Sequence, residues 1–360
     1  MQYQIIKGEP YLGSDPELFV KDGDRIIGSE KVIPPEGLLG IARDGVQIEL
    51  HPEPYICRAS AANTLAGLFH SLQRHLSKVP SLSVCFDEVV ELSKAEMDEL
   101  SPESRVLGCQ PSLNIYDDKA EVRVPPDYPV RSAGGHIHVG NSLQGEDAKR
   151  FIAVMDVLVG NTCVLIDRHP KAAERRQVYG RAGEYRIQPY GVEYRTLSNF
   201  WLQGHQLWSL IGGLTKLAQG IVSYRGHYEK TGKKDAWGYD QMDWVKPEGC
   251  DPVKDLFANV EQELVRKAIN ENDLSLAYKN WEGVKAFLTE HVPQQDSGLH
   301  AENLENFEYF AKVVQEKGLQ TFFGDPLRQW LYLGDQHGRG WESFSDQVLT
   351  GARMRGDHAS

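Results

Sequence analysis

Carboxylates, imidazoles and guanidiniums recur at two-residue spacing in several short segments of this 360-residue chain. In a β-strand, residues i and i+2 lie on the same face. Asp15 and Glu17 would therefore share one face of a strand, and His136 and His138 would share one face of another. The same rule predicts three further shared-face sets: Gln47, Glu49, His51 and Glu53; Glu184 and Arg186; and Glu193 and Arg195.

These polar faces contain almost no Lys, Ser or Thr, which an ordinary solvated face would also use. If the strands are neighbours, like charges about 4 Å apart would repel by about 4 kcal/mol at an effective dielectric of ~20. Bound cations or raised pKa values would relieve that repulsion. Oxygen-rich ligand sets with some histidine favour Mg²⁺ or Mn²⁺, and arginines beside them can bind phosphate bidentately. The pattern predicts a metal–phosphate site suited to phosphoryl transfer.

The elements that must position these residues change in character near residue 200. Before it, alternating segments bounded by Gly and Pro predict strands at 12–20, 46–53, 112–115, 135–140, 183–187 and 192–197. Helical periodicity predicts helices at 59–79, 145–167, 204–224, 252–269, 276–288 and 301–315, and residues 230–246 read as a loop.

Strands come first and helices follow, which predicts an α+β fold with a curved, mainly antiparallel sheet backed by helices. We expect the strands carrying Asp15, Glu49, His136 and Glu193 to belong to one such sheet. The residues 188–191, Gln-Pro-Tyr-Gly, lie between two Glu-Tyr-Arg segments and predict a hairpin turn.

Four blocks of the sequence resemble the glutamine synthetase-like carboxylate–amine ligases, which include the glutamate–cysteine ligases. The blocks are Gly13-Ser-Asp-Pro-Glu-Leu-Phe19, Gly134-Gly-His-Ile-His-Val-Gly140, the pair Arg181 and Arg186, and Glu193-Tyr-Arg195. With Tyr190-Gly-Val-Glu-Tyr-Arg-Thr-Leu-Ser-Asn-Phe-Trp201, the resemblance is nearest to the phage-type carboxylate–amine ligases of type 2. It covers residues 10–205.

The resemblance implies an ATP-dependent ligase with the sheet of that superfamily. ATP would phosphorylate a substrate carboxylate to an acyl phosphate, and an amine would attack it to form an amide. Two or three Mg²⁺ or Mn²⁺ ions would bridge the phosphates and the carboxylate. The substrates would be small-molecule or peptide carboxylates and amines, chosen by loops.

The resemblance also implies roles for individual residues. Metal ligands would come from Asp15, Glu17, Glu49, Glu53, His136 and Glu193. Arg181, Arg186 and Arg195 would hold the γ-phosphate and the acyl phosphate, and His138 would help to bind the cofactor. Asp15 is shorter than the Glu often found at that position, and Pro16 removes a hydrogen-bond donor, so we expect an edge or a bulge there.

Two other functions fit parts of the pattern. His136 and His138 are compatible with a zinc pair in a metal-dependent hydrolase, with a Glu activating the water. A non-catalytic protein on a ligase-like fold is the third possibility. The sequence contains neither a Gly-x-x-x-x-Gly-Lys-Ser/Thr loop nor a Gly-x-Gly-x-x-Gly after a strand, so a nucleotide would be held without these devices.

Composition narrows the functional class. The 51 acidic and 39 basic residues give a net charge of −12, which disfavours binding of a nucleic-acid backbone. No apolar run long enough for a membrane span and no secretory signal is visible. Five widely spaced cysteines without a Cys-x-x-Cys pair predict reduced thiols in a cytoplasm, the host's if the protein is phage-encoded. A homo-oligomer is compatible with the sequence.

The length fits one large domain or two. We expect a ligase-like catalytic part at residues 1–205 and a mainly helical part at 206–360 packed on it.

Overall fold

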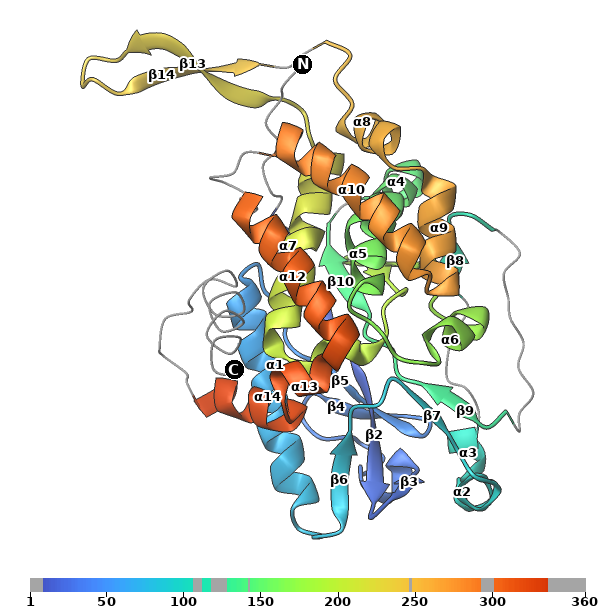
Figure 1. The fold of residues 1–360 in the computed structure, drawn as a ribbon. Coiled ribbons are helices and arrows are strands. Elements are labelled where there is room, and N and C mark those ends of the chain that lie inside the picture. The colour runs from blue at the N-terminus through green and yellow to red at the C-terminus, as the bar shows by residue number, and fades with distance from the viewer. Residues whose placement is uncertain are drawn as a thin grey trace, which may run out of the picture.

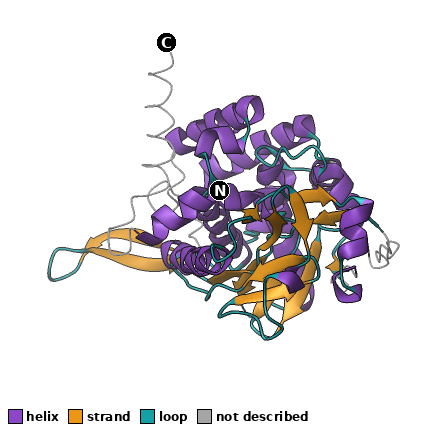
Figure 2. Cartoon of the chain, turned by 90° about the horizontal axis from the view of Figure 1, so that it is seen from below, coloured by secondary structure: helices purple, strands orange, loops and turns teal. Residues whose placement is uncertain are grey.

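The computed structural model describes residues 9–105, 112–117, 128–141, 143–245, 248–292 and 301–335. It has the predicted α+β architecture, with antiparallel sheets and a helical C-terminal part (Figure 1). Seen from below, most of the strands gather on one side of the body and most of the helices on the other (Figure 2).

The first sheet carries a row of site residues. Its five antiparallel strands, in spatial order, are β1 (Tyr11–Ser14), β10 (Ile137–Gly140), β12 (Gly191–Tyr194), β11 (Glu184–Gln188) and β8 (Leu113–Asn114). The predicted hairpin is confirmed as β11 and β12. Gly13 lies opposite His138, His138 opposite Glu193, and Glu193 opposite Arg186. These four residues therefore cross the sheet in one row on one face.

A second sheet lies beside the first one. It contains β2 (Glu17–Asp22), β3 (Arg25–Ile27), β4 (Ile41–Asp44), β5 (Gln47–Leu50) and β6 (Leu82–Cys85), and β7 (Val89–Glu91) pairs separately with β9 (Val130–Ser132). Glu17 on β2 lies opposite Glu49 on β5.

The expectation of one sheet carrying all four site strands is wrong, because Glu49 and Glu193 lie in different sheets. The predicted strand 12–20 breaks at Asp15 and Pro16, where the chain leaves the first sheet and enters the second. Pro16 has no N–H with which to continue the ladder of β1, and its carbonyl accepts from Leu50 N of the second sheet (3.0 Å).

Helices cover the sheets, and the following lie in segments predicted to be helical: α1 (Arg58–Leu76), α4 (Gly145–Met155), the π-helical turn η2 (Asp156–Gly160), α5 (Asn161–Val164), α7 (His205–Val222), α8 (Pro252–Asn259), α9 (Gln262–Glu271), α10 (Leu274–His291) and α12 (Ala301–Lys317). The helical elements that were not predicted are η1 (Ser29–Lys31), α2 (Lys94–Glu99), α3 (Pro102–Arg105), α6 (Ala172–Val178), η3 (Asn199–Gln203), α13 (Leu319–Phe323) and α14 (Pro326–Asp335).

One continuous hydrophobic core joins the sheets to the C-terminal helices. It includes Leu12 and Val192 of the first sheet together with Trp208 of α7 and Trp330 of α14. Trp330 is fully buried, and its indole N–H donates to the carbonyl of Leu202 (2.8 Å). In the described part of the chain, no helix combines the length and the apolar character that a membrane span requires.

The predicted loop at 230–246 is wrong, because this segment forms a hairpin of β13 (His227–Lys234) and β14 (Asp240–Val245). The hairpin extends away from the body in both views (Figures 1 and 2). Among the described strands, β13 and β14 pair only with each other, so the sequence lacks the alternation that burial of one face imposes on a strand.

A buried carboxyl group lies behind the first sheet, at the start of the π-helical turn. The carboxylate of Asp156 accepts hydrogen bonds from the hydroxyls of Tyr194 (2.7 Å) and Tyr116 (2.9 Å). Complete burial nevertheless raises the pKa of Asp156 to about 7. The folded protein therefore holds this proton more tightly than the unfolded chain does.

Asp156 should make the free energy of unfolding depend on pH. Its folded-state pKa is raised, so its stabilising contribution is complete below about pH 4 and is lost as the pH rises through about 7. In that window we expect wild type to lose stability relative to Asp156→Asn by up to about 1.4 kcal/mol per pH unit. Chemical denaturation of both proteins across this window measures the difference, and parallel profiles would contradict the assignment.

Candidate active site

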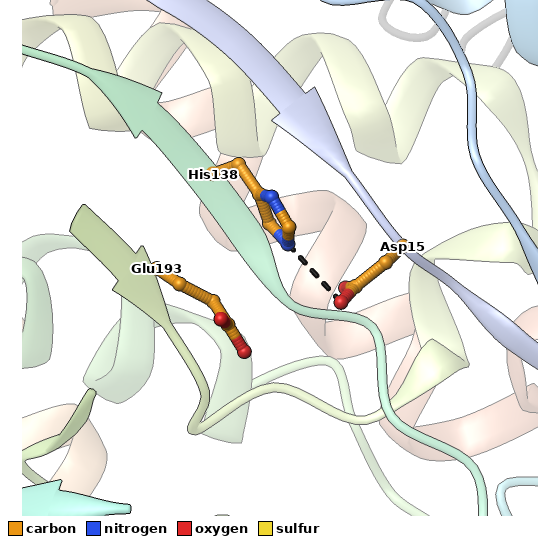
Figure 3. Close-up of side chains that lie close together, drawn as sticks. All are labelled: Asp15, His138 and Glu193. Atoms are coloured by element: carbon orange, nitrogen blue, oxygen red, sulfur yellow. Dashed lines mark ion pairs between the residues drawn. The ribbon is translucent and has the colours of Figure 1, made fainter. Parts of the chain in front are cut away.

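The centre of the site is Asp15, at the break between the two sheets (Figure 3). Its Oδ2 lies 3.1 Å from Nε2 of His138, and its Oδ1 lies 3.0 Å from Nδ1 of His136. Nδ1 of His136 is also 3.7 Å from Oε1 of Glu193. The structure thus brings together four of the residues that the sequence selected.

Two glycines allow the segment that carries His136 and His138 to pack closely against its neighbours. A Cβ on Gly135 would lie 2.4 Å from the carbonyl oxygen of Ser198 and 2.4 Å from Nε1 of Trp201. A Cβ on Gly134 would lie 2.5 Å from Nε2 of His136. Only glycine tolerates such close approaches, which explains why the two glycines precede His136 in the motif.

Glu193 is almost completely buried and is surrounded by donors. Its Oε1 lies 2.9 Å from Nε of Arg195 and 3.5 Å from Nη1 of Arg186. Its Oε2 accepts a hydrogen bond from Nε2 of Gln188 (2.7 Å). Burial of a carboxylate requires such compensation, so these groups hold Glu193 in place.

The three arginines differ in how accessible their guanidinium groups are to a ligand. Arg195 is buried and also donates to the hydroxyls of Tyr179 (2.6 Å) and Ser112. The side chain of Arg186 is 24% exposed, and its contact with Glu193 is the longer one. Nε of Arg181 lies 2.9 Å from Oε1 of Glu184. Of the three, Arg186 combines contact with the cluster and access to solvent.

Tyr179, just after α6, connects the histidine strand to the arginines. Its hydroxyl accepts from Nη2 of Arg195 and makes a short hydrogen bond with Nε2 of His136. The guanidinium of Arg195 lies over its ring, 4.9 Å from the centroid. Tyr179 therefore fixes the orientation of both groups.

The second sheet contributes further carboxylates. Oε2 of Glu17 accepts from the backbone N–H of Gly134 (2.7 Å) and from Nε2 of Gln47 (2.8 Å). Oε2 of Glu49 lies 2.7 Å from Nε2 of His51. Glu53 follows the end of β5, is exposed, and joins none of the ion pairs of the described cluster residues, so the structure gives no support to Glu53 as a ligand.

Electrostatic interactions unite the two sheets into one charged cluster. Burial would raise the pKa of Asp15, but His136 and His138 hold it well below its usual value. Burial, and then the charge of Asp44, raise the pKa of Glu17 well above its usual value. Burial and Glu49 likewise raise the pKa of Asp44. The carboxylates of the two sheets therefore act on one another's pKa values.

The donor atoms fit a divalent cation. Asp15, His138 and Glu193 each offer one ligand atom, and these atoms lie within 4.8 Å of one another. Asp15 Oδ1, His136 Nδ1, His138 Nε2 and Glu193 Oε1 are buried, and their partners are the ion pairs of the cluster. Carboxylate oxygens and a neutral imidazole nitrogen gathered this closely are donor types that a divalent cation uses.

Sequence reasoning missed the groups that support the charged residues. Tyr179 and Gln188 orient His136, Arg195 and Glu193, and nothing in their local pattern marks them. Asp44 was also missed, although the Asp44-Gly45 pair before an alternating segment is a known hairpin signal.

Part of the chain matches a known protein family. Residues 125–224 match the model of the family described as phage phiEco32-like COOH.NH2 ligase type 2. The segment is similar to these carboxylate–amine ligases. The resemblance indicated by the motifs is thus confirmed, and the match includes His136, His138, Arg186 and Glu193. No curated protein matched the chain.

Removal of the Tyr179 hydroxyl should weaken metal binding. Tyr179→Phe keeps the ring beneath Arg195 but leaves His136 Nε2 and Arg195 Nη2 without this partner. Loss of an outer partner of a metal site costs about 10–100-fold in affinity. We expect a decrease of that size in Mn²⁺ affinity, measured by calorimetric titration.

Tyr278→Phe is the matched control, because its hydroxyl accepts a hydrogen bond from Gln315 (3.0 Å) away from the site. Its Mn²⁺ affinity should equal that of wild type. Equal affinities for the Tyr179 and Tyr278 variants would show that Tyr179 does not position the cluster.

Proposed function

We propose that this protein is an ATP-dependent carboxylate–amine ligase that forms an amide through an acyl phosphate. The observation that carries the proposal is the row His138–Glu193–Arg186 across the first sheet, completed by Asp15. It places a potential cation site directly beside a partly exposed guanidinium. A cation next to an arginine suits a phosphoryl group that is transferred.

Asp15, His138 and Glu193 would hold a divalent ion, His136 contacts Asp15, and Glu17 interacts electrostatically with both Asp15 and Glu49. Mg²⁺ or Mn²⁺ bound here would neutralise charge on the phosphates of ATP. His136 and His138 lower the pKa of Asp15, which favours its ionised form, and binding of the ion requires His138 to be neutral.

The two arginines of the late strands have different roles in this proposal. Arg186 would contact the transferred phosphoryl group, because its guanidinium is the more accessible. Arg195 would instead position Glu193 by direct contact and His136 through Tyr179. The carboxylate attacks the γ-phosphorus, the bond to ADP breaks, and Arg186 stabilises the negative charge on the phosphoryl oxygens.

Acyl phosphate formation tests the proposal without a known amine. Hydroxylamine traps acyl phosphates as hydroxamates, so we expect Mg-ATP and one member of a panel of amino acids and short peptides to give a hydroxamate and equimolar ADP. Arg186→Lys keeps the charge but loses the planar fork. It should lower kcat about 10²–10³-fold, as loss of one charge-stabilising donor does.

The Glu193→Gln variant distinguishes a loss of metal affinity from a general loss of activity. The variant should be impaired at low Mg²⁺ and partly rescued when Mg²⁺ or Mn²⁺ is raised, because the lost charge lowers metal affinity. Glu91→Gln is the control, since Glu91 pairs only with Lys171 at the surface among its described contacts (2.6 Å). Tightly retained zinc with hydrolase activity and no ATP turnover would favour the metal-dependent hydrolase instead.

A further inference from the structure

A pocket of about 660 Å³ opens beside the charged cluster, along the β1 edge of the first sheet. Asp15 and His138 lie at its inner end, and Tyr11, Tyr190, His51 and Pro54 contribute to its walls. Pockets of this volume hold small organic molecules and are far larger than ammonia requires. The pocket therefore has room for a whole substrate next to the reacting centre.

Glycines keep the floor of the pocket open. Gly13 lies opposite His138 in the row of site residues and carries no side chain to cover it. Gly140 lies opposite Tyr11 on the same pair of strands. A Cβ on Gly13 would lie 3.4 Å from the Cβ atoms of His138 and Pro54, which is ordinary contact. Alanine therefore fits at position 13 and would occupy space in the pocket.

The walls are aromatic and apolar. Tyr190 stacks on the ring of His138 with centroids 5.6 Å apart and 12° between the planes. Its hydroxyl lies 2.6 Å from Nδ1 of His138, which fixes the ring as a wall. Tyr11 is 55% exposed, so its face remains available to a ligand. Such walls bind apolar bodies and attract cations to the ring faces.

The lining of the pocket distinguishes between the substrates of a ligase. Its lining residues, all in the described part of the chain, include no Lys or Arg, whereas the rings of Tyr11 and Tyr190 line its walls. Arg186 lies at the other end of the row, on β11, beyond β10 and β12. An anionic phosphate or carboxylate would find a guanidinium there, and a cation would find the ring faces of Tyr11 and Tyr190 in the pocket.

We propose that this pocket binds the amine acceptor, and that the acceptor is a primary amine on an apolar or aromatic body, without a carboxylate of its own. This inference rests on the proposed ligase function. The amine nitrogen attacks the acyl carbon, the C–N bond forms, and the C–O bond to phosphate breaks with its electron pair leaving on phosphate. Of the two protons that the ammonium loses, one ends on the phosphate and the other in water.

Binding of simple probes tests the inference directly. Phenethylamine, phenethyl alcohol and 3-phenylpropanoate share one ring and differ in charge, and adenosine represents the nucleotide base. We expect phenethylamine to bind the full chain at least about tenfold more tightly than the other three, by ligand-observed NMR titration. Gly13→Val should lower the affinity for phenethylamine at least about tenfold, because its side chain fills part of the pocket.

Gly13→Ala should weaken phenethylamine binding by a smaller factor than Gly13→Val. It replaces Gly13→Val in the test if that variant does not fold, since the added methyl group fits. Gly67→Ala is the matched control, because Gly67 is exposed on α1 with open space around its Cβ position. It should bind like wild type. Tighter binding of 3-phenylpropanoate or adenosine, or phenethylamine binding that ignores both Gly13 variants, would overturn the inference.

A second readout on the same samples keeps the inference and the ligase proposal distinguishable. Mg-ATP should raise the melting temperature of wild type and of Gly13→Ala alike, because the phosphate end of the row is unchanged. A normal shift with Mg-ATP but no selective amine binding would refute the acceptor pocket alone. Selective amine binding with no effect of Mg-ATP would refute the ligase proposal and leave an amine-binding pocket without its reaction.

Discussion

The double contact of Asp15 with His136 and His138 is the interaction on which the rest of the site depends. Its two oxygens lie 3.0 and 3.1 Å from nitrogens of the two imidazoles. Asp15 can reach both only because Pro16 ends the first strand at this point and turns the chain into the second sheet. The break that separates the sheets therefore also creates the place where their charged residues meet.

The side chains of the first sheet change in chemical character from its β1 edge inward. Apolar and aromatic groups lie at β1, the potential metal ligands lie just after β1 and on β10 and β12, and an accessible guanidinium lies at β11. The side chains of one row share a face, so these groups lie on the same side of the sheet. Gln188 contacts Glu193 of the row directly and Tyr179 supports Glu193 through Arg195, and pre-organised groups of this kind give charge stabilisation without reorganisation.

The parts that the sequence predicted correctly depend on local periodicity, and the parts that it missed depend on distant partners. Alternation and the Pro-Tyr-Gly turn predicted the hairpin of β11 and β12, and the structure pairs Glu193 with Arg186 within it. Pro16 marked an interruption, but the change of sheet depends on pairing with β5, which no local pattern encodes. Tyr179 is bound to His136, which is distant in sequence, and Asp44 acts through space on Glu17. Long-range contacts of these kinds require the fold itself.

The location of a bound metal tests the account's central claim most directly. Anomalous diffraction from crystals grown with Mn²⁺ and a non-hydrolysable ATP analogue would place the ion without reference to activity. The account predicts a peak about 2.0–2.3 Å from donor atoms of Asp15, His138 and Glu193, with the γ-phosphate between the ion and Arg186. A peak elsewhere, with the donors of Asp15, His138 and Glu193 still paired only with one another, would contradict it.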